Sequence, residues 1–249
     1  MLGGREVVDF HAHVGRWDAL GMGADAAQML RVMDRAGIDR ACIFGIFHPD
    51  GRPGNDAALA LARSHPGRFI PFAYVSPLMP DHMVPELERA VDKEGCRGIK
   101  LYPPAAGAPL TDPAWDPVLE FAADRGLAVL SHTGEEATCH PAQLGEVAAR
   151  YPGARFVAGH AGNVAPYRRQ AIEAARACGN VYLETCSSYR APGVIEELVQ
   201  GAGADRVLFG SDMPLMDPRV QLGKIVTADL TDGEKGLILG GNAHQVLGP

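Results

Sequence analysis

The chain alternates short apolar runs with amphipathic segments over nearly its whole length. Eight runs rich in Val, Ile, Leu and Phe mostly lack strict alternation of polar and apolar residues, which is typical of strands covered on both faces. These runs lie at residues 7–14, 41–47, 68–77, 96–103, 127–134, 154–162, 180–188 and 206–214.

The segments between the runs have helical periodicity, are about three turns long, and mostly end in glycine, the usual stop signal of a helix. Strands that alternate with helices imply parallel pairing. The predicted helices occupy residues 25–37, 55–67, 83–95, 116–126, 141–153, 167–179 and 193–203, with a last one at 232–241.

Eight strand–helix repeats in 249 residues predict an α/β fold, a single (β/α)8 TIM barrel. No low-complexity linker divides the sequence, so we expect one domain over residues 1–249. An open doubly wound sheet is the competing fold. It would have fewer strands and often a glycine-rich phosphate turn after the first one, where this chain has HAHVGRW.

If the chain is a barrel enzyme, its functional side chains should lie at the carboxyl ends of the strands, because barrel enzymes carry them there. His11 and His13 end the first run, His132 ends the fifth, His160 the sixth and Asp212 the eighth. These residues are far apart in the sequence, and they meet at one mouth of the barrel only if the fold is right.

The His-x-His pair raises its own question. In a regular strand, His11 and His13 share one face with Val7 and Asp9. Burying two imidazoles side by side is costly unless something binds them, and a metal ion is the natural candidate. Asp9 lies deeper in the strand and is expected to be structural or to support the ligands from behind.

Several motifs resemble the amidohydrolase superfamily of metal-dependent barrel enzymes, and in particular its amidohydrolase-related, aminocarboxymuconate semialdehyde decarboxylase-like branch. They are DFHAHVG, GIKLYP, HTG, GHAGN, FGSDMP and GNAHQVL. The resemblance implies that His11, His13, His132 and Asp212 bind one zinc-like ion, and that His160 is a catalytic group beside it. Hydrolases and non-oxidative decarboxylases share these motifs.

The residue types agree with that chemistry. Three neutral imidazoles and one carboxylate suit zinc or a similar divalent ion. Zinc lowers the pKa of bound water to about 7, which makes hydroxide available at neutral pH. Asp212 can accept a proton from that water, and His160 can polarise a substrate oxygen or move protons. Asp212 and His160 are therefore the predicted catalytic residues.

Lys100 ends the fourth run, where binuclear members of the superfamily carry a carbamylated lysine that bridges two metals. An unmodified Lys100 would instead offer an ammonium to a substrate carboxylate. We favour the unmodified lysine and one ion, because the motifs resemble the mononuclear branch; carbamylation would mean two. Arg16, His48, Tyr102 and Arg190 fall on predicted top-face loops and are expected to line the substrate pocket with Lys100.

The composition limits the classes of partner that this protein is expected to bind. A formal net charge of −7 without a basic stripe argues against nucleic acid. No apolar run approaches membrane-spanning length and no signal peptide is expected. The five cysteines lack a CxxC pair and are interpreted as small core residues in a cytoplasmic protein. A small-molecule substrate is the expected partner, and a homo-oligomer is compatible with the sequence.

These observations leave three functions open. The first prediction is metal-dependent hydrolysis of a small, acidic organic ester, lactone or amide. The second is non-oxidative decarboxylation of an aromatic or unsaturated carboxylic acid. The third is a catalytically inactive barrel that only binds a ligand, which the costly cluster of ionisable groups argues against.

Overall fold

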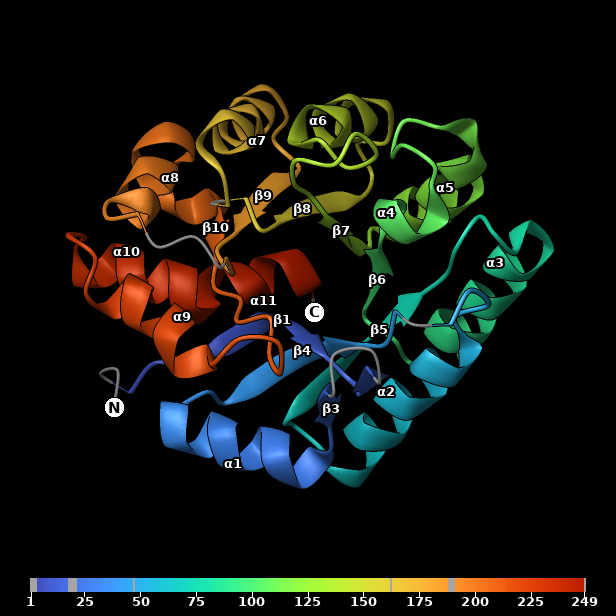
Figure 1. The fold of residues 1–249 in the computed structure, drawn as a ribbon, viewed down its shortest axis with the longest axis horizontal. Helices are drawn as coiled ribbons and strands as arrows, with labels where there is room; N and C mark the ends of the chain where they lie inside the picture. The colour runs from blue at the N-terminus through green and yellow to red at the C-terminus, as the bar shows by residue number, and fades with distance from the viewer. Residues whose placement is uncertain (1–3, 18–21, 47, 162, 188–190, 249) are drawn as a thin grey trace.

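The computed structural model describes residues 4–17, 22–46, 48–161, 163–187 and 191–248. Eight strands pair in parallel and in chain order, and they form the ring at the centre of Figure 1. They are β1 (Val8–His13), β4 (Arg40–Phe44), β5 (Phe69–Tyr74), β6 (Gly98–Leu101), β7 (Ala128–His132), β8 (Arg155–Gly159), β9 (Val181–Glu184) and β10 (Val207–Leu208).

Strand β1 meets the chain that follows β10 through backbone hydrogen bonds. The amide of Phe10 donates to the carbonyl of Phe209 at 2.9 Å, and the amide of His13 donates to the carbonyl of Met213 at 2.7 Å. The predicted (β/α)8 barrel is thereby confirmed.

Helices surround the barrel on its outside (Figure 1). They are α1 (Ala26–Ala36), α2 (Arg52–Ser64), α3 (Pro80–Leu87), α4 (Pro103–Ala106), α5 (Asp116–Arg125), α6 (Pro141–Arg150), α7 (Ala165–Ala177), α8 (Val194–Ala202), α9 (Pro218–Val226), α10 (Asp232–Gly236) and α11 (Asn242–Leu247). The helix predicted at 83–95 begins earlier, as α3, and continues as a π-helical stretch over Glu88–Lys93. No described helix is long and apolar enough to cross a membrane.

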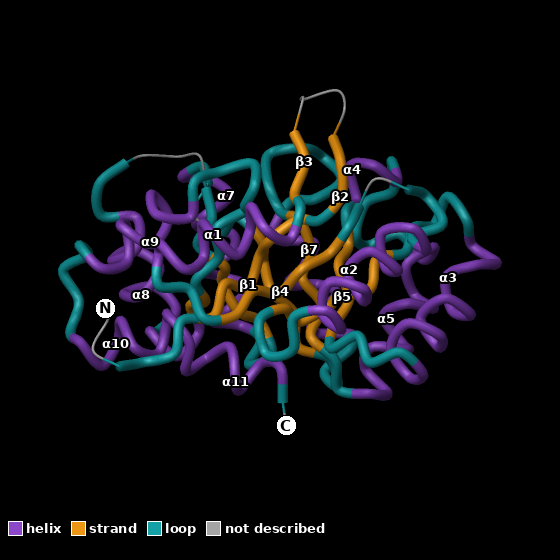
Figure 2. Tube along the Cα trace, turned by 90° about the horizontal axis from the view of Figure 1, so that it is seen from below, coloured by secondary structure: helices purple, strands orange, loops and turns teal. Residues whose placement is uncertain are grey.

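The structure contains elements that were not predicted from the sequence, among them a hairpin and the helices α4, α9 and α11. A short antiparallel hairpin, β2 (Gly15–Trp17) with β3 (Met22–Ala24), follows β1 and projects from the end of the barrel opposite the C-terminus (Figure 2). Helix α9 was not predicted. It begins where Asp217 accepts a hydrogen bond from the amide of Arg219 at 2.9 Å, a side-chain cap that fixes the start of a weakly patterned helix.

The apolar core has two layers. One lies between the strands and the helices. The other fills the barrel interior, where Phe10 and Phe72 pack edge to face with ring centroids 5.6 Å apart. Phe44 ends this inner layer, because its ring contacts both His11 and His13, with centroids 5.2 and 4.7 Å away. The barrel interior thus changes from apolar to polar where the strands end.

Candidate metal centre

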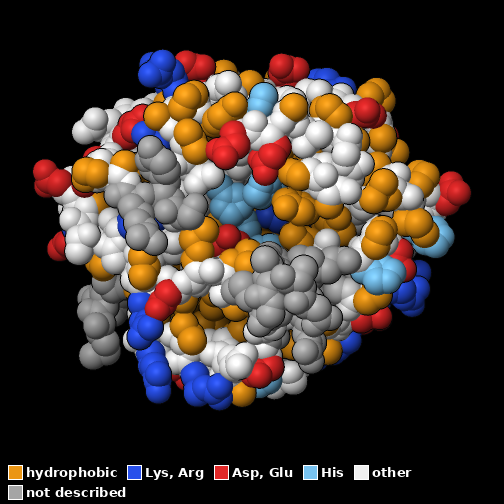
Figure 3. Space-filling view, in the orientation of Figure 1, with side chains coloured by type: hydrophobic (Ala, Val, Ile, Leu, Met, Phe, Trp, Pro, Cys, Tyr) orange, Lys and Arg blue, Asp and Glu red, His pale blue; other side chains and the backbone are white. Residues whose placement is uncertain are grey.

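A pocket of about 260 Å³ opens at the carboxyl ends of the strands. Figure 3 looks into it and shows histidine side chains gathered on the floor of a central hollow. Every residue predicted as a metal ligand reaches this pocket, and so do His160, Lys100 and Tyr102. The pocket is lined by His11, His13, Ile46, Lys100, Tyr102, His132, His160, Asn163, Asp212, Leu215 and Met216.

Asp212 binds both histidines of the first strand. Its Oδ1 lies 2.9 Å from Nε2 of His13 and 3.5 Å from Nε2 of His11. Burial alone would raise the pKa of Asp212, but the hydrogen bond to His13 and the nearby His160, His13 and Lys100 outweigh it and lower that pKa. Asp212 is therefore ionised at neutral pH, as a metal ligand must be.

A bulge in β1 aims the two histidines at the pocket. The pairing of β1 with β4 shifts register between Asp9 and Ala12, and the carboxylate of Asp9 accepts the amide of His11 at 3.1 Å. Val7 packs in the outer core layer, whereas His11 and His13 face the pocket. The sequence prediction that His11 and His13 share one face with Val7 is therefore wrong, because the bulge changes which face they point to.

Two of the site residues have a backbone conformation that residues other than glycine rarely adopt. The φ angles of His160 and Asp212 are 63° and 61°, in the left-handed region. The amide of Asp212 donates to the carbonyl of His11 at 2.7 Å, and the amide of Ser211 donates to Asp9 at 2.8 Å. These bonds hold the strand end in its turn, and such strain concentrates at functional sites.

The imidazoles form a continuous row. Ring centroids lie 4.8 Å apart for His11 and His160, 4.7 Å for His160 and His132, and 4.9 Å for His132 and Tyr102. Burial is the main cause that lowers the pKa of His11, His13, His132 and His160. Neutral imidazoles keep a nitrogen lone pair for a cation. With the carboxylate of Asp212, this donor set fits a divalent metal ion.

Lys100 is almost fully buried at 1% exposure, and its Nζ lies 3.3 Å from Nε2 of His11. Burial lowers the pKa of Lys100 to about 8, while Asp212, Cys186 and Glu184 act in the opposite direction. The amine also lies over the ring of Phe44, 4.8 Å from its centroid. The pocket floor therefore holds a nitrogen that can carry positive charge beside the imidazoles.

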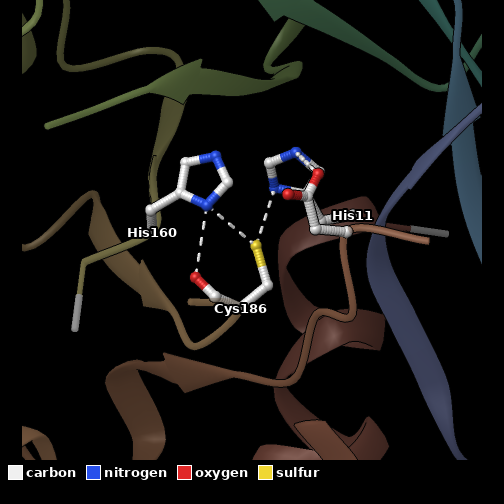
Figure 4. A group of neighbouring side chains, drawn as sticks. His11, His160 and Cys186 are labelled. Atoms are coloured by element: carbon white, nitrogen blue, oxygen red, sulfur yellow. Dashed lines mark hydrogen bonds and ion pairs between the residues drawn. The ribbon is translucent and has the colours of Figure 1, made fainter. Parts of the chain in front are cut away.

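Sequence reasoning missed two residues at the end of β9, Glu184 and Cys186. Oε2 of Glu184 lies 2.8 Å from Nδ1 of His11, and Sγ of Cys186 lies 3.1 Å from Nδ1 of His160 (Figure 4). Burial raises the pKa of Glu184 to about 8, against the hydrogen bonds from Cys186 and His160. The strand-end rule that found the other residues also points to Glu184. The interpretation of Cys186 as a simple core residue overlooked its polar neighbours.

Of the remaining predicted pocket residues, His48 does not join this cluster. His48 has a side chain that is 57% exposed and lies 2.8 Å from Oδ1 of Asp50. Arg16 lies in β2, outside the barrel sheet, and Arg190 lies outside the described residues. Their roles as substrate-binding residues stay predictions.

A parallel barrel with imidazoles and a carboxylate gathered at the carboxyl ends of its strands is an architecture suited to chemistry at a bound metal ion. The family model of the amidohydrolases matches residues 8–248, and the chain belongs to this family. The resemblance inferred from the motifs is confirmed.

Proteins similar to this chain include two hydratases and a decarboxylase. A 2-keto-4-carboxy-3-hexenedioate hydratase of Sphingobium sp. is 27% identical over 209 residues, which are 66% of this chain; the match spans 60% of the hydratase. The 5-carboxyvanillate decarboxylase of Sphingomonas paucimobilis shares the fold with a TM-score of 0.80 and 16% identity, over 98% of this chain and 99% of that one. The 4-oxalomesaconate hydratase of Rhodopseudomonas palustris has a TM-score of 0.72 and 20% identity, over 97% and 95%.

Replacement of His160 by asparagine tests the division between binding and catalysis. Asparagine tolerates the left-handed backbone at this position but cannot relay a proton. We expect His160→Asn to keep its metal and to lower kcat by about 100-fold or more. Turnover is measured against metal content by elemental analysis, with His82→Asn on the exposed part of α3 as the control. Loss of the metal without a separate effect on rate would make His160 a ligand.

Proposed function

We propose that this protein is a metal-dependent lyase that removes CO₂ from a small aromatic or unsaturated carboxylic acid. One divalent ion, with zinc as our first choice, would be held by His11, His13, His132 and Asp212. The substrate carboxylate would be met by Lys100. Asp212 and His160 would move the proton.

The observation that carries this proposal is the amine of Lys100 within the imidazole cluster. Its Nζ, 3.3 Å from Nε2 of His11, is buried beside the predicted ligands and lines the same pocket. A compact ammonium at this depth attracts an anionic group, and a carboxylate is the anion that the named relatives' substrates share. The pocket of about 260 Å³ suits a small substrate.

The reaction class is supported by the relatives. Solved structures that share the fold over nearly the whole chain include decarboxylases, and one of them, from Novosphingobium aromaticivorans, is a complex with manganese and a nitrobenzoic acid. A bound divalent ion would supply positive charge to polarise a substrate oxygen and stabilise the electrons left by the departing carboxylate. The hydrolase function, predicted first from the sequence, has less support from these relatives.

The protein's own residues can balance the reaction. The bond between the substrate carbon and its carboxylate breaks, CO₂ leaves, and the electron pair stays on the carbon. That carbon takes a proton from the carboxyl of Asp212. Asp212 is ionised in the free site and so must first accept a proton, from a substrate hydroxyl or from water. His160, 4.8 Å from His11 between ring centroids, is placed to accept a hydrogen bond from that substrate hydroxyl before its proton leaves.

Hydration of an unsaturated polycarboxylic acid is the second candidate, because the curated relative at 27% identity is a hydratase. The same groups would serve: Asp212 would take a proton from the attacking water and return it to the neighbouring carbon of the double bond.

A substrate panel separates these functions. Protein loaded with zinc or with manganese is incubated with carboxylated phenols, unsaturated di- and tricarboxylic acids, and lactones. Release of CO₂ and addition of water are followed separately. We expect CO₂ release from at least one carboxylated phenol or unsaturated acid. Water addition without CO₂ release would favour the hydratase, and lactone opening alone would restore the hydrolase prediction.

Lys100→Ala tests the carboxylate anchor. Loss of the ammonium should raise KM for the acidic substrate by about tenfold or more, because a charge-assisted hydrogen bond disappears, and should leave metal content near one ion per chain. Lys93→Ala, at an exposed position, is the control. Two ions per chain that depend on bicarbonate and vanish in Lys100→Ala would instead establish a carbamylated, binuclear site.

A further inference from the structure

The chain that leaves β9 contacts two pocket imidazoles from behind. Figure 4 shows His11 and His160 with their Nδ1 atoms turned toward Cys186. Nδ1 of His160 lies 3.2 Å from the carbonyl oxygen of Cys186, and Nδ1 of His11 lies 2.8 Å from Oε2 of Glu184. The pocket therefore meets these rings from the side of their Nε2 atoms.

The partner of His160 fixes its protonation. A backbone carbonyl oxygen only accepts hydrogen bonds, so the Nδ1 that bonds to it carries the proton. In a neutral imidazole the other nitrogen, Nε2, then has the lone pair.

The hydrogen bond between His11 and Glu184 also places the ring proton on Nδ1. The carboxylate of Glu184 receives the amide of His160 at 3.2 Å and the thiol of Cys186 at 3.0 Å, both on Oε2, and the amide of Cys186 on Oε1. Burial favours the protonated carboxyl of Glu184, but three donors already occupy its two oxygens, and a carboxyl so surrounded acts as the acceptor. His11 therefore donates from Nδ1. On the other side of the ring, the amine of Lys100 lies 3.3 Å from Nε2, where it can donate to a lone pair.

Glycines make room for this arrangement. A Cβ at Gly210 would overlap Oε1 of Glu184, and a Cβ at Gly159 would lie 3.3 Å from Cε1 of His11. The carboxylate thus lies flat against the backbone of the neighbouring strand end. Replacement of Gly210 by alanine would displace Glu184 without removing it.

From these contacts we infer that the Glu184–Cys186 segment sets the tautomers of His11 and His160. Both rings carry the proton on Nδ1 and present the Nε2 lone pair to the pocket. Glu184 is then a positioning residue, which acts on the proposed metal centre through His11. The inference rests on the proposed function only in what the Nε2 atoms would bind; the tautomers themselves do not depend on it.

The tautomers can be read directly. Protein labelled with ¹⁵N in histidine, freed of metal by a chelator, gives long-range ¹H–¹⁵N spectra that distinguish the two ring nitrogens. We expect the Nδ1–H form for His11 and His160 in the wild type. The Nε2–H form at either residue would overturn the inference, whether or not the protein binds metal.

Glu184→Leu removes the acceptor behind His11. We expect His11 to lose its preference for the Nδ1–H form, while His160 keeps it because the Cys186 carbonyl remains. Zinc affinity, measured by chelator competition, should fall by about 10- to 100-fold, the usual effect of losing such a partner. Gly210→Ala should produce the same change at His11 by displacing the carboxylate. If both variants retain the wild-type tautomer and zinc affinity, the inference is wrong.

Three further variants separate positioning from packing. Glu184→Gln keeps an oxygen that can accept from His11 and should preserve its tautomer. Cys186→Ala removes the thiol but not the carbonyl and should preserve the tautomer of His160. Thr185→Val is the matched control, since the buried Oγ1 of Thr185 has no hydrogen-bond partner among the described residues. A shift in either tautomer in Thr185→Val would mean that any disturbance of the segment has this effect, and would overturn the role of Glu184.

If the wild-type tautomers are as inferred but no zinc binds, the proposed function fails and the inference stands. If zinc binds and the tautomers differ, the reverse holds.

Discussion

A protein in which His11 and His13 are both alanine should bind no divalent ion and should lack activity. The two imidazoles contribute two of the four predicted ligands, and both lie against the carboxylate of Asp212. A structural or catalytic metal site rarely survives with half of its protein ligands. Wild-type protein purified without chelator should contain about one ion per chain, measured by elemental analysis.

The fold should survive this change. The barrel interior is filled by apolar side chains such as Phe10, Phe72 and Leu130, which the substitutions do not touch. Far-UV circular dichroism should therefore be close to that of the wild type. His82→Ala/His244→Ala is the matched double control, because both side chains are exposed and lie on α3 and α11. Unchanged metal content in the His11/His13 variant would refute the assignment.

The fold could be predicted because its signal is repeated along the chain. Each apolar run is short and buried on both faces, and nearly every one is followed by a glycine-terminated helix. The ends of those runs then located His132, His160, Lys100 and Asp212, since parallel strands bring their carboxyl ends to one side. No single motif was needed for this step, only the register of the repeats.

What could not be predicted depends on local hydrogen bonds. Alternation along β1 assigned His11 to the face of Val7, but the register shift after Asp9 changes the parity. The bulge is held by the carboxylate of Asp9, which also binds Ser211, 202 residues away in the chain. A contact over that separation leaves no trace in the periodicity of the first strand.

The roles of Glu184 and Cys186 also could not be predicted from the sequence. Their position after an apolar run is visible in the sequence, yet their importance comes from where the side chains point. The left-handed backbone of His160 turns its ring toward Cys186, and Gly210 opens the space for Glu184. Neither fact follows from the composition of the run itself.

Asp212→Asn should impair metal retention and turnover together, with kcat lower by about a thousandfold. The carboxylate is both the anionic ligand and the proposed proton carrier. Burial would raise the pKa of Asp212, but its hydrogen bond to His13 and the nearby His160, His13 and Lys100 lower it, so the lost group is a full negative charge. Asparagine keeps the size and one oxygen but brings an NH₂ group toward Nε2 of His11 and His13.

Asparagine is chosen because it removes the negative charge of residue 212 without straining the backbone there. Asp212 has φ 61°, and asparagine is among the few residues that adopt this conformation readily. Asp212→Ala adds a strain of about 1–2 kcal/mol to the loss of charge. Asp212→Asn should therefore unfold near the wild-type temperature, and Asp212→Ala should unfold at a lower one.

Zinc affinity, kcat and thermal unfolding are measured on both variants and on Asp205→Asn, whose side chain is 65% exposed. Equal losses of kcat in Asp212→Asn and Asp212→Ala, with near-wild-type values in the control, would support the role of the charge. If Asp212→Asn retains zinc and its turnover when fully loaded, Asp212 is neither the anionic ligand nor the proton carrier, and the proton must pass through His160 instead.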